Sequence, residues 1–211
     1  MANTTNNYIL DKQVFILGGF DPQETNQMIG ELAKMVQSLP IHPIYSTKHE
    51  QTSPYDTKDI INPIIDIYIN SNGGDASILH SISALLSIAR SRGAIIRTTV
   101  LCNAASCGSL LAVQGTPGFR IMNEYATHMI HFGASRVRVE KEDEIKLATK
   151  YMQQTHKRME DIYLKHTDLT QAQLKKIMKN EHGHLFPDEC LQHNICDWVI
   201  DTFGNIRGKT R

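Results

Sequence analysis

A serine stands where a predicted strand gives way to a predicted helix, within residues 103–109 (Asn-Ala-Ala-Ser-Cys-Gly-Ser). The neighbours of Ser106 are small, so a substrate carbonyl could approach its hydroxyl, and a helix start supplies partial positive charge and unpaired N–H groups. This placement suits a nucleophile. It is not the elbow of the α/β-hydrolases, because no Gly-x-Ser-x-Gly is present. Taken alone, a serine at a helix start is more often only a cap.

Two further segments could complete a catalytic centre. The turn Gly73-Gly74 follows an apolar run, and its glycines allow backbone N–H groups to approach a bound oxyanion. His131 ends a short apolar segment, where an imidazole could accept the serine proton. Separately, these segments would be an ordinary strand-to-helix turn and a structural histidine. Only as a set with Ser106 do they carry a functional argument.

The elements that must position these residues alternate along the chain. Apolar, β-branched runs predict strands at residues 13–17, 64–69, 95–101, 119–122 and 128–131. Helical patterns follow Asp21, a predicted N-cap, and Asp75, and a short apolar helix opens at Ser106. Alternating strands and helices predict an α/β fold with a largely parallel sheet.

The longest helical pattern covers residues 142–166. One side carries the apolar residues Ile145, Ala148, Met152, Met159 and Ile162. Further apolar residues, which would leave a second face partly uncovered, are Leu147, Tyr151, Tyr163 and Leu164. This second face predicts a subunit interface, and the plainer alternative is a helix packed only on its own core.

Composition predicts one domain covering residues 1–211, since the chain is 211 residues long with 41% hydrophobic content. The 22 basic and 22 acidic residues balance, so neither nucleic acid nor a membrane is an expected partner. Residues 38–62 are polar and proline-rich, which predicts a surface insertion. A polar N-terminus and the lack of a bilayer-length apolar run lead us to expect a cytoplasmic protein.

The four cysteines are too few and too irregularly spaced for a disulfide framework, so we expect reduced thiols in the core. A group of potential metal ligands near the C-terminus comprises His182, His184, Cys190 and His193. Their spacing lacks the paired ligands of zinc sites, so ordinary hydrogen-bonded histidines are the favoured interpretation. We expect no metal and no cofactor.

Taken together, three segments resemble the proteolytic subunit of Clp proteases in order and approximate spacing. They are residues 69–75 (Ile-Asn-Ser-Asn-Gly-Gly-Asp), 103–109 and 129–132 (Met-Ile-His-Phe). The resemblance extends to residues 14–19, to the long helix, and to residues 186–190 and 195–197, and it covers nearly the whole chain apart from residues 38–62. It implies the fold of stacked β-β-α units shared with crotonases, in which a long helix protrudes after the histidine strand.

The resemblance also implies a serine endopeptidase that hydrolyses peptides and unfolded proteins. Ser106 would be the nucleophile and His131 the general base, while the backbone N–H groups of Gly73 and Cys107 would form the oxyanion hole. The implied partners are copies of the chain in stacked heptameric rings, a tetradecamer, with an AAA+ unfoldase. Peptides would bind extended beside the glycine turn as an added strand.

The sequence departs from the family pattern at the third triad position. Where the family usually has an aspartate, this chain has His182, with Glu181 beside it. A histidine stabilises an imidazolium less than a carboxylate does, so slower catalysis is expected unless Glu181 substitutes. The other alternative is a Ser-His dyad that neither residue contacts. The segment before the first predicted strand is also shorter than the gating segment that the family usually has there.

Two other functions remain open from the sequence. A catalytically silent subunit, acting structurally in a mixed ring, would explain the missing aspartate. A crotonase-type acyl-CoA enzyme would use a related fold, but it needs no nucleophilic serine, and nothing in the sequence indicates a CoA pocket.

Overall fold

The computed structural model describes residues 7–45, 53–131, 142–179 and 183–209. Its elements are β1 (Asn7–Leu10), β2 (Gln13–Ile16), α1 (Pro22–Ser38), β3 (Ile64–Ser71), α2 (Ala76–Ser91), β4 (Ile95–Ala105), α3 (Cys107–Ala112), β5 (Arg120–Asn123), β6 (Thr127–Ile130), α4 (Glu142–His166), α5 (Gln171–Lys179), β7 (Gly183–Leu185), α6 (Pro187–Gln192), β8 (Trp198–Ile200) and β9 (Ile206–Gly208).

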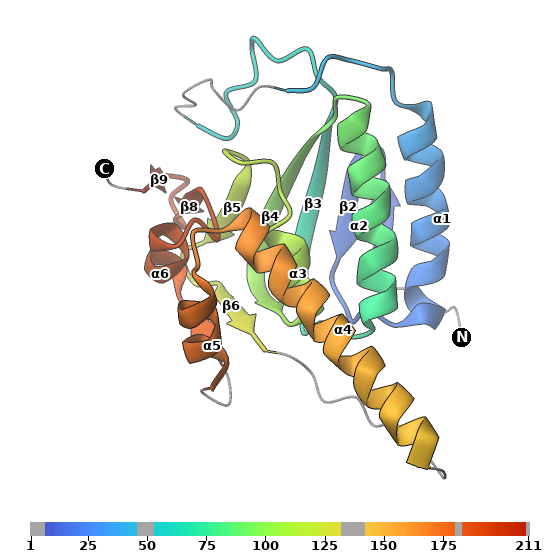
Figure 1. Cartoon of the computed structure of the whole chain (residues 1–211). Coiled ribbons are helices and arrows are strands. Elements are labelled where there is room, and N and C mark those ends of the chain that lie inside the picture. The colour runs from blue at the N-terminus through green and yellow to red at the C-terminus, as the bar shows by residue number, and fades with distance from the viewer. Residues whose placement is uncertain (1–6, 46–52, 132–141, 180–182, 210–211) are drawn as a thin grey trace, which may run out of the picture.

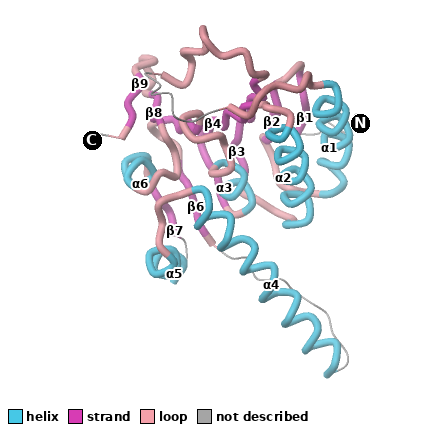
Figure 2. The backbone as a smooth tube through the Cα atoms, turned by 45° about the horizontal axis from the view of Figure 1, so that its top comes forward, coloured by secondary structure: helices cyan, strands magenta, loops and turns pink. Residues whose placement is uncertain are grey.

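The described strands form one mixed sheet in the order β1-β2-β3-β4-β5-β8-β9. Outside this order, β6 pairs with β4, and β7 pairs with β6. Strands β2, β3, β4, β5 and β8 are parallel, whereas β1, β7 and β9 each pair antiparallel with a neighbour. Helices α1, α2 and α3 cover one face of the sheet (Figures 1 and 2). The predicted mixed α/β architecture with a largely parallel centre is confirmed.

The sheet and helices meet in one hydrophobic core. Alternate residues of β3 are buried, among them Ile65, Ile67 and Ile69, as expected for a strand with one face under helices. From α2, the core receives Leu79, Ile82 and Leu86. These side chains pack β3 against α2. Strand β3 pairs parallel with β4, and the ends of these two strands carry the candidate site.

The start of α1 follows the sequence signals. The Asp21 carboxylate accepts hydrogen bonds from Gln23 N (2.7 Å) and Glu24 N (3.4 Å), and Pro22 occupies the first turn. These contacts satisfy donors that a helix start leaves unpaired. The predicted N-cap is therefore confirmed.

Residues 39–45 and 53–63 connect α1 to β3 without forming a helix or strand. Part of this connection packs against the sheet face that α1 and α2 do not cover, since the Tyr55 ring lies 5.0 Å from the Arg97 guanidinium. Arg97 also donates to the Pro54 carbonyl and pairs with Asp66. Ile41 and Ile44 are exposed. The insertion predicted for residues 38–62 thus includes both exposed and packed positions.

Helix α4 crosses in front of α3, and its N-terminal half extends beyond the sheet and the other helices (Figure 1). Ile145, Leu147 and Tyr151 are exposed on it, as the sequence predicted for the last two. Tyr163 is a correction: it is fully buried rather than part of an uncovered face. No helix among the described residues combines the length and the apolar character needed to cross a bilayer.

Candidate active site

Ser106 joins the end of β4 to the start of α3 in a strained conformation. Its backbone has φ 54° and ψ −119°, a region that residues with a side chain rarely adopt. The surroundings hold it there: the Ser106 N–H donates to the Met129 carbonyl (3.0 Å), and its carbonyl accepts from Leu110 N–H (3.0 Å). A strained backbone conformation persists only where the surrounding packing enforces it, and such residues are common at functional sites.

The glycine turn after β3 lies directly against this serine. A Cβ placed on Gly73 would lie 2.6 Å from the Ser106 Cβ, 2.7 Å from the Ala105 oxygen and 2.9 Å from the Cys107 nitrogen. Gly73 also has φ +90° and Gly74 φ +147°. Only glycine combines this backbone conformation with so close an approach. The predicted proximity of the turn to Ser106 is therefore observed.

Hydrogen bonds hold the turn in place. Ser71 Oγ donates to the Gly18 carbonyl (2.6 Å) and accepts from the Gly73 N–H (3.1 Å). The oxyanion role predicted for Gly73 thus requires this N–H to exchange Ser71 Oγ for a substrate oxygen, and it stays a prediction. Cys107 opens α3, so its N–H is one of those that a helix leaves without an intrahelical acceptor.

The Cys107 thiol is not a competing nucleophile. Burial raises the pKa of Cys107 to about 11, and its Sγ–H donates to the Gly74 carbonyl at 3.1 Å. A neutral thiol in this position links α3 to the glycine turn. All four cysteines are unpaired, and three are buried as predicted, whereas Cys102 is exposed.

His131 reaches the same edge of the sheet as Ser106. Strands β4 and β6 are parallel, with Ala105 beside Met129, and Ser106 and His131 follow these strands directly. Residues that follow paired parallel strands emerge at a common edge, where sites in α/β proteins form. The half-buried His131 therefore lies at the sheet edge that carries the serine.

The predicted third members of the triad, Glu181 and His182, lie outside the described residues. Strand β7, which begins at Gly183, pairs antiparallel with β6 and places Gly183 opposite Ile130. The described chain therefore resumes beside the strand that precedes His131.

Ser106 opens onto a cavity of about 360 Å³, a size common for ligand sites. Its lining comes from the glycine turn, the start of α2 and the middle of α4: Gly74, Asp75, Ala76, Ser77, Ser106, Tyr151, Met152, Thr155, His156 and Met159. Helix α4 thus forms a mixed apolar and polar wall opposite the serine.

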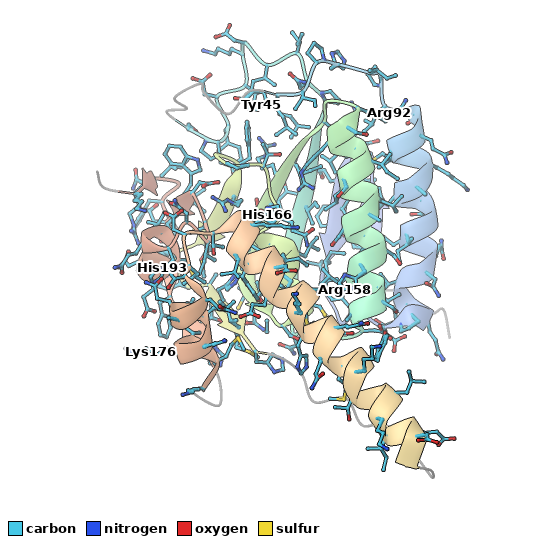
Figure 3. All side chains as sticks on the ribbon, viewed as in Figure 1. Tyr45, Arg92, Arg158, His166, Lys176 and His193 are labelled. Atoms are coloured by element: carbon cyan, nitrogen blue, oxygen red, sulfur yellow. The ribbon has the colours of Figure 1, made fainter. Side chains whose placement is uncertain are left out.

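A second cavity, of about 340 Å³, is lined by residues of α5, β7 and α6, including Lys176, His184 and His193, and Ser106 is not among its lining residues. Lys176 and His193 are labelled in Figure 3. Of the predicted potential metal ligands, His184 and His193 meet in this cavity, while Cys190 is buried and His182 falls outside the described chain. Among the described residues, no three His, Cys, Asp or Glu side chains are grouped to hold a metal ion.

His128, on β6, is a buried histidine that the sequence did not single out. Burial lowers its pKa to about 3, so the imidazole is neutral at physiological pH. Its ring stands edge-on to that of Tyr163, with centroids 6.4 Å apart. The Nε2 atom has no hydrogen-bond partner in the described structure. His128 is therefore a structural imidazole buried in the core.

Acidification should destabilise the protein through His128. Between pH 6.5 and 3 an unfolded chain carries a protonated imidazole and the native state does not, so the unfolded state binds more protons and stability falls as pH falls. The expected slope is about 1.4 kcal/mol per pH unit, or about 2 kcal/mol from pH 6.5 to pH 5. Urea unfolding at these two pH values measures it.

His128→Leu should remove that part of the slope. Two other histidines should leave part of the pH dependence in place. Burial and the nearby Arg90 and Arg120 lower the pKa of His166 to about 4, and burial and Arg158 lower the pKa of His80. A slope unchanged by the substitution would show that His128 accepts a proton in the native state.

A strained serine against a glycine turn, with a histidine at the same sheet edge, is the arrangement expected of a hydrolase of mixed α/β fold. The sequence model of the Clp protease family matches residues 55–203. The chain belongs to the Clp protease family, a family of peptidases.

Relatives named "ATP-dependent Clp protease proteolytic subunit" agree with this assignment. The protein from Deinococcus radiodurans is 31% identical over 144 residues, 68% of each chain. Its counterpart from Lactococcus lactis is 28% identical over 151 residues, 69% of each chain. That from Streptococcus pyogenes is also 28% identical over 151 residues, covering 69% of this chain and 70% of the relative. The resemblance to Clp proteolytic subunits predicted from the motifs is confirmed.

Proposed function

We propose that this chain is the serine endopeptidase subunit of a self-compartmentalising Clp-type protease. The observation that carries the proposal is Ser106: a strained residue at a strand-to-helix junction, at the edge reached by His131, opening onto the cavity under α4. A cap needs neither the strain nor the cavity. A nucleophile needs both exposure to substrate and a fixed orientation.

In this mechanism, Ser106 Oγ attacks the scissile carbonyl carbon while its proton passes to His131. The carbonyl oxygen becomes an oxyanion, which the N–H groups of Cys107 and Gly73 stabilise, with Cys107 the better supported because the Gly73 N–H already donates to Ser71 Oγ. Collapse breaks the peptide bond, and His131 returns its proton to the leaving amine. Water then hydrolyses the acyl-enzyme by the same route in reverse.

His182 or Glu181 would orient His131. The support for this role is the antiparallel pairing of Gly183 with Ile130. Glu181 and His182 directly precede Gly183 in the chain, and His131 directly follows Ile130. A carboxylate would stabilise the imidazolium more than a second imidazole.

Assembly would place these sites inside stacked heptameric rings, a tetradecamer, which keeps a broad-specificity peptidase from other proteins. Exposed apolar residues on the projecting helix α4, Leu147 and Tyr151, support an interface there. The relatives' printed name, that of an ATP-dependent protease, supports an ATP-dependent partner. In this proposal that partner is an unfoldase, which would supply unfolded proteins as substrates. The insertion at about 38–62 would belong to the surface of the same single domain.

Treatment with a fluorophosphonate probe tests the proposal. The probe should form one covalent adduct, which peptide mapping by mass spectrometry should assign to Ser106. Heat-denatured protein is the control, since an unfolded serine has no activating base. Folded, assembled protein that takes up no probe would contradict the proposal and favour a silent structural subunit.

A further inference from the structure

A buried pair of hydroxyl groups lies directly behind Ser106. Ser109, in the first turn of α3, and Tyr163, near the end of α4, are both 0% exposed and hydrogen-bonded to each other. Ser109 Oγ also donates to the Ser106 carbonyl at 2.8 Å. A serine hydroxyl has one hydrogen, which Ser109 gives to the carbonyl, so Tyr163 must be the donor in the other bond. The chain of donors runs from Tyr163 through Ser109 to Ser106.

The carbonyl at the end of this chain belongs to the peptide group between Ser106 and Cys107. That group is planar, so the orientation of its carbonyl also fixes the direction of the Cys107 N–H. The ψ angle of Ser106, −119°, sets this orientation within a backbone conformation that is strained. A strained peptide keeps its direction only where its surroundings hold it, and the Ser109 hydroxyl adds a second bond to the one from Leu110 N–H.

The buried setting strengthens the effect. Hydrogen bonds in a low-dielectric interior polarise one another along a chain. A donor on the carbonyl oxygen draws electron density through the peptide and makes its N–H a stronger donor. Burial raises the pKa of Tyr163 above its ordinary value, so this residue keeps its proton and remains a donor at physiological pH.

We propose that Tyr163 and Ser109 are positioning residues that aim and polarise the Cys107 N–H toward the oxyanion. The inference rests on the proposed function, because it assigns a role in that same site. The Cys107 N–H is a main-chain group that substitution cannot remove, and this inference names two side chains whose substitution should weaken it as an oxyanion donor. The inference also gives α4 two roles, since this helix lines the cavity through residues such as Met152 and Met159 and reaches the nucleophile's peptide through Tyr163.

Removing either hydroxyl tests the proposal. Deleting an oxyanion donor typically costs about 10²- to 10³-fold in kcat, so losing a group that only orients one should cost about 5- to 50-fold. Ser109→Ala and Tyr163→Phe should each lower kcat for a fluorogenic peptide by that factor while KM changes less than about twofold. The double variant should lose about as much as Ser109→Ala alone, because both hydroxyls act through one chain.

A peptide boronate separates positioning from folding. Its adduct with Ser106 is tetrahedral and places an oxygen where the oxyanion forms, so its affinity should fall by the same factor as kcat in each variant. Ser83→Ala is the matched control: it removes a buried serine hydroxyl on α2 that has no partner in the described structure, and kcat should not change. All assays are run below the thermal midpoint of each variant.

The outcomes distinguish the inference from the function on which it rests. Wild-type protein that labels and cleaves, together with variants whose kcat and boronate affinity are unchanged, would overturn the positioning role alone. A fall in kcat without a fall in boronate affinity would also overturn it. Wild-type protein that neither labels nor cleaves would overturn the proposed function, and the positioning role with it.

Discussion

Replacing Ser106 with alanine should reduce kcat/KM for a fluorogenic peptide by at least about 10³-fold, with no change in fold. Alanine keeps the Cβ, so the contact with Gly73 and the strained backbone are preserved and only the hydroxyl is lost. The fluorophosphonate adduct should disappear with it. Circular dichroism and gel filtration check that the variant remains folded and assembled. Residual activity near the wild-type level would assign the hydrolysis to another residue.

Ser106→Gly should also be inactive, yet more stable than the alanine variant. The angles φ 54° and ψ −119° match the first central position of a type II′ turn, where glycine carries no steric penalty. Relief of backbone strain normally stabilises by about 1–3 kcal/mol. This gain should outweigh the stability that glycine costs by making the unfolded chain more flexible, about 0.4–1 kcal/mol. Urea unfolding should therefore order the two inactive variants with glycine higher. An alanine variant as stable as the glycine variant would show that Ser106 is not strained.

The segments of the candidate active site were predictable because each carries a local signal. Ser106, Gly73 and His131 stand at strand ends, where apolar periodicity stops and small or polar residues begin. The parallel register then brings those ends together, as a largely parallel sheet requires. The identity of the third triad member has no such signal, since Glu181 and His182 are adjacent in the sequence and neither ends an apolar run.

The buried network behind the serine could not be predicted from periodicity. A helical wheel assigns Tyr163 to a face of α4 but does not say which distant segment covers that face. The covering residue, Ser109, lies 54 positions earlier. The signal that could have found it is chemical: a tyrosine among apolar neighbours near a helix end needs a partner for its hydroxyl.

Short strands escaped detection for a different reason. Strands β7, β8 and β9 have three residues each, too few for an alternating pattern to stand out. The hairpin of β1 and β2 turns at Asp11-Lys12, with Asp11 at φ 53°. Two-residue hairpins usually signal themselves with glycine, which this turn lacks.

Gly73→Ala should damage both stability and activity. The added Cβ would meet the Ser106 Cβ and two backbone atoms, the Ala105 oxygen and the Cys107 nitrogen, all closer than 3.0 Å, in a residue at φ +90°. Because backbone cannot rotate away as a side-chain tip can, the β4–α3 junction must move. We expect a loss of about 2–4 kcal/mol in the free energy of unfolding. If Ser106 is the proposed nucleophile, a shift of this size there should lower kcat by at least about 10²-fold.

Two other glycines separate the causes of that loss. Gly204 has a similar φ of +83° but nothing within 4 Å of an added Cβ, so Gly204→Ala should cost only the backbone penalty of about 1–2 kcal/mol and leave kcat unchanged. Gly30 lies in α1 with open space around it, and Gly30→Ala should gain about 0.5–1 kcal/mol from helix propensity. If Gly73→Ala lost no more stability than Gly204→Ala and kept its kcat, close approach of the turn could not be what holds Ser106 in place.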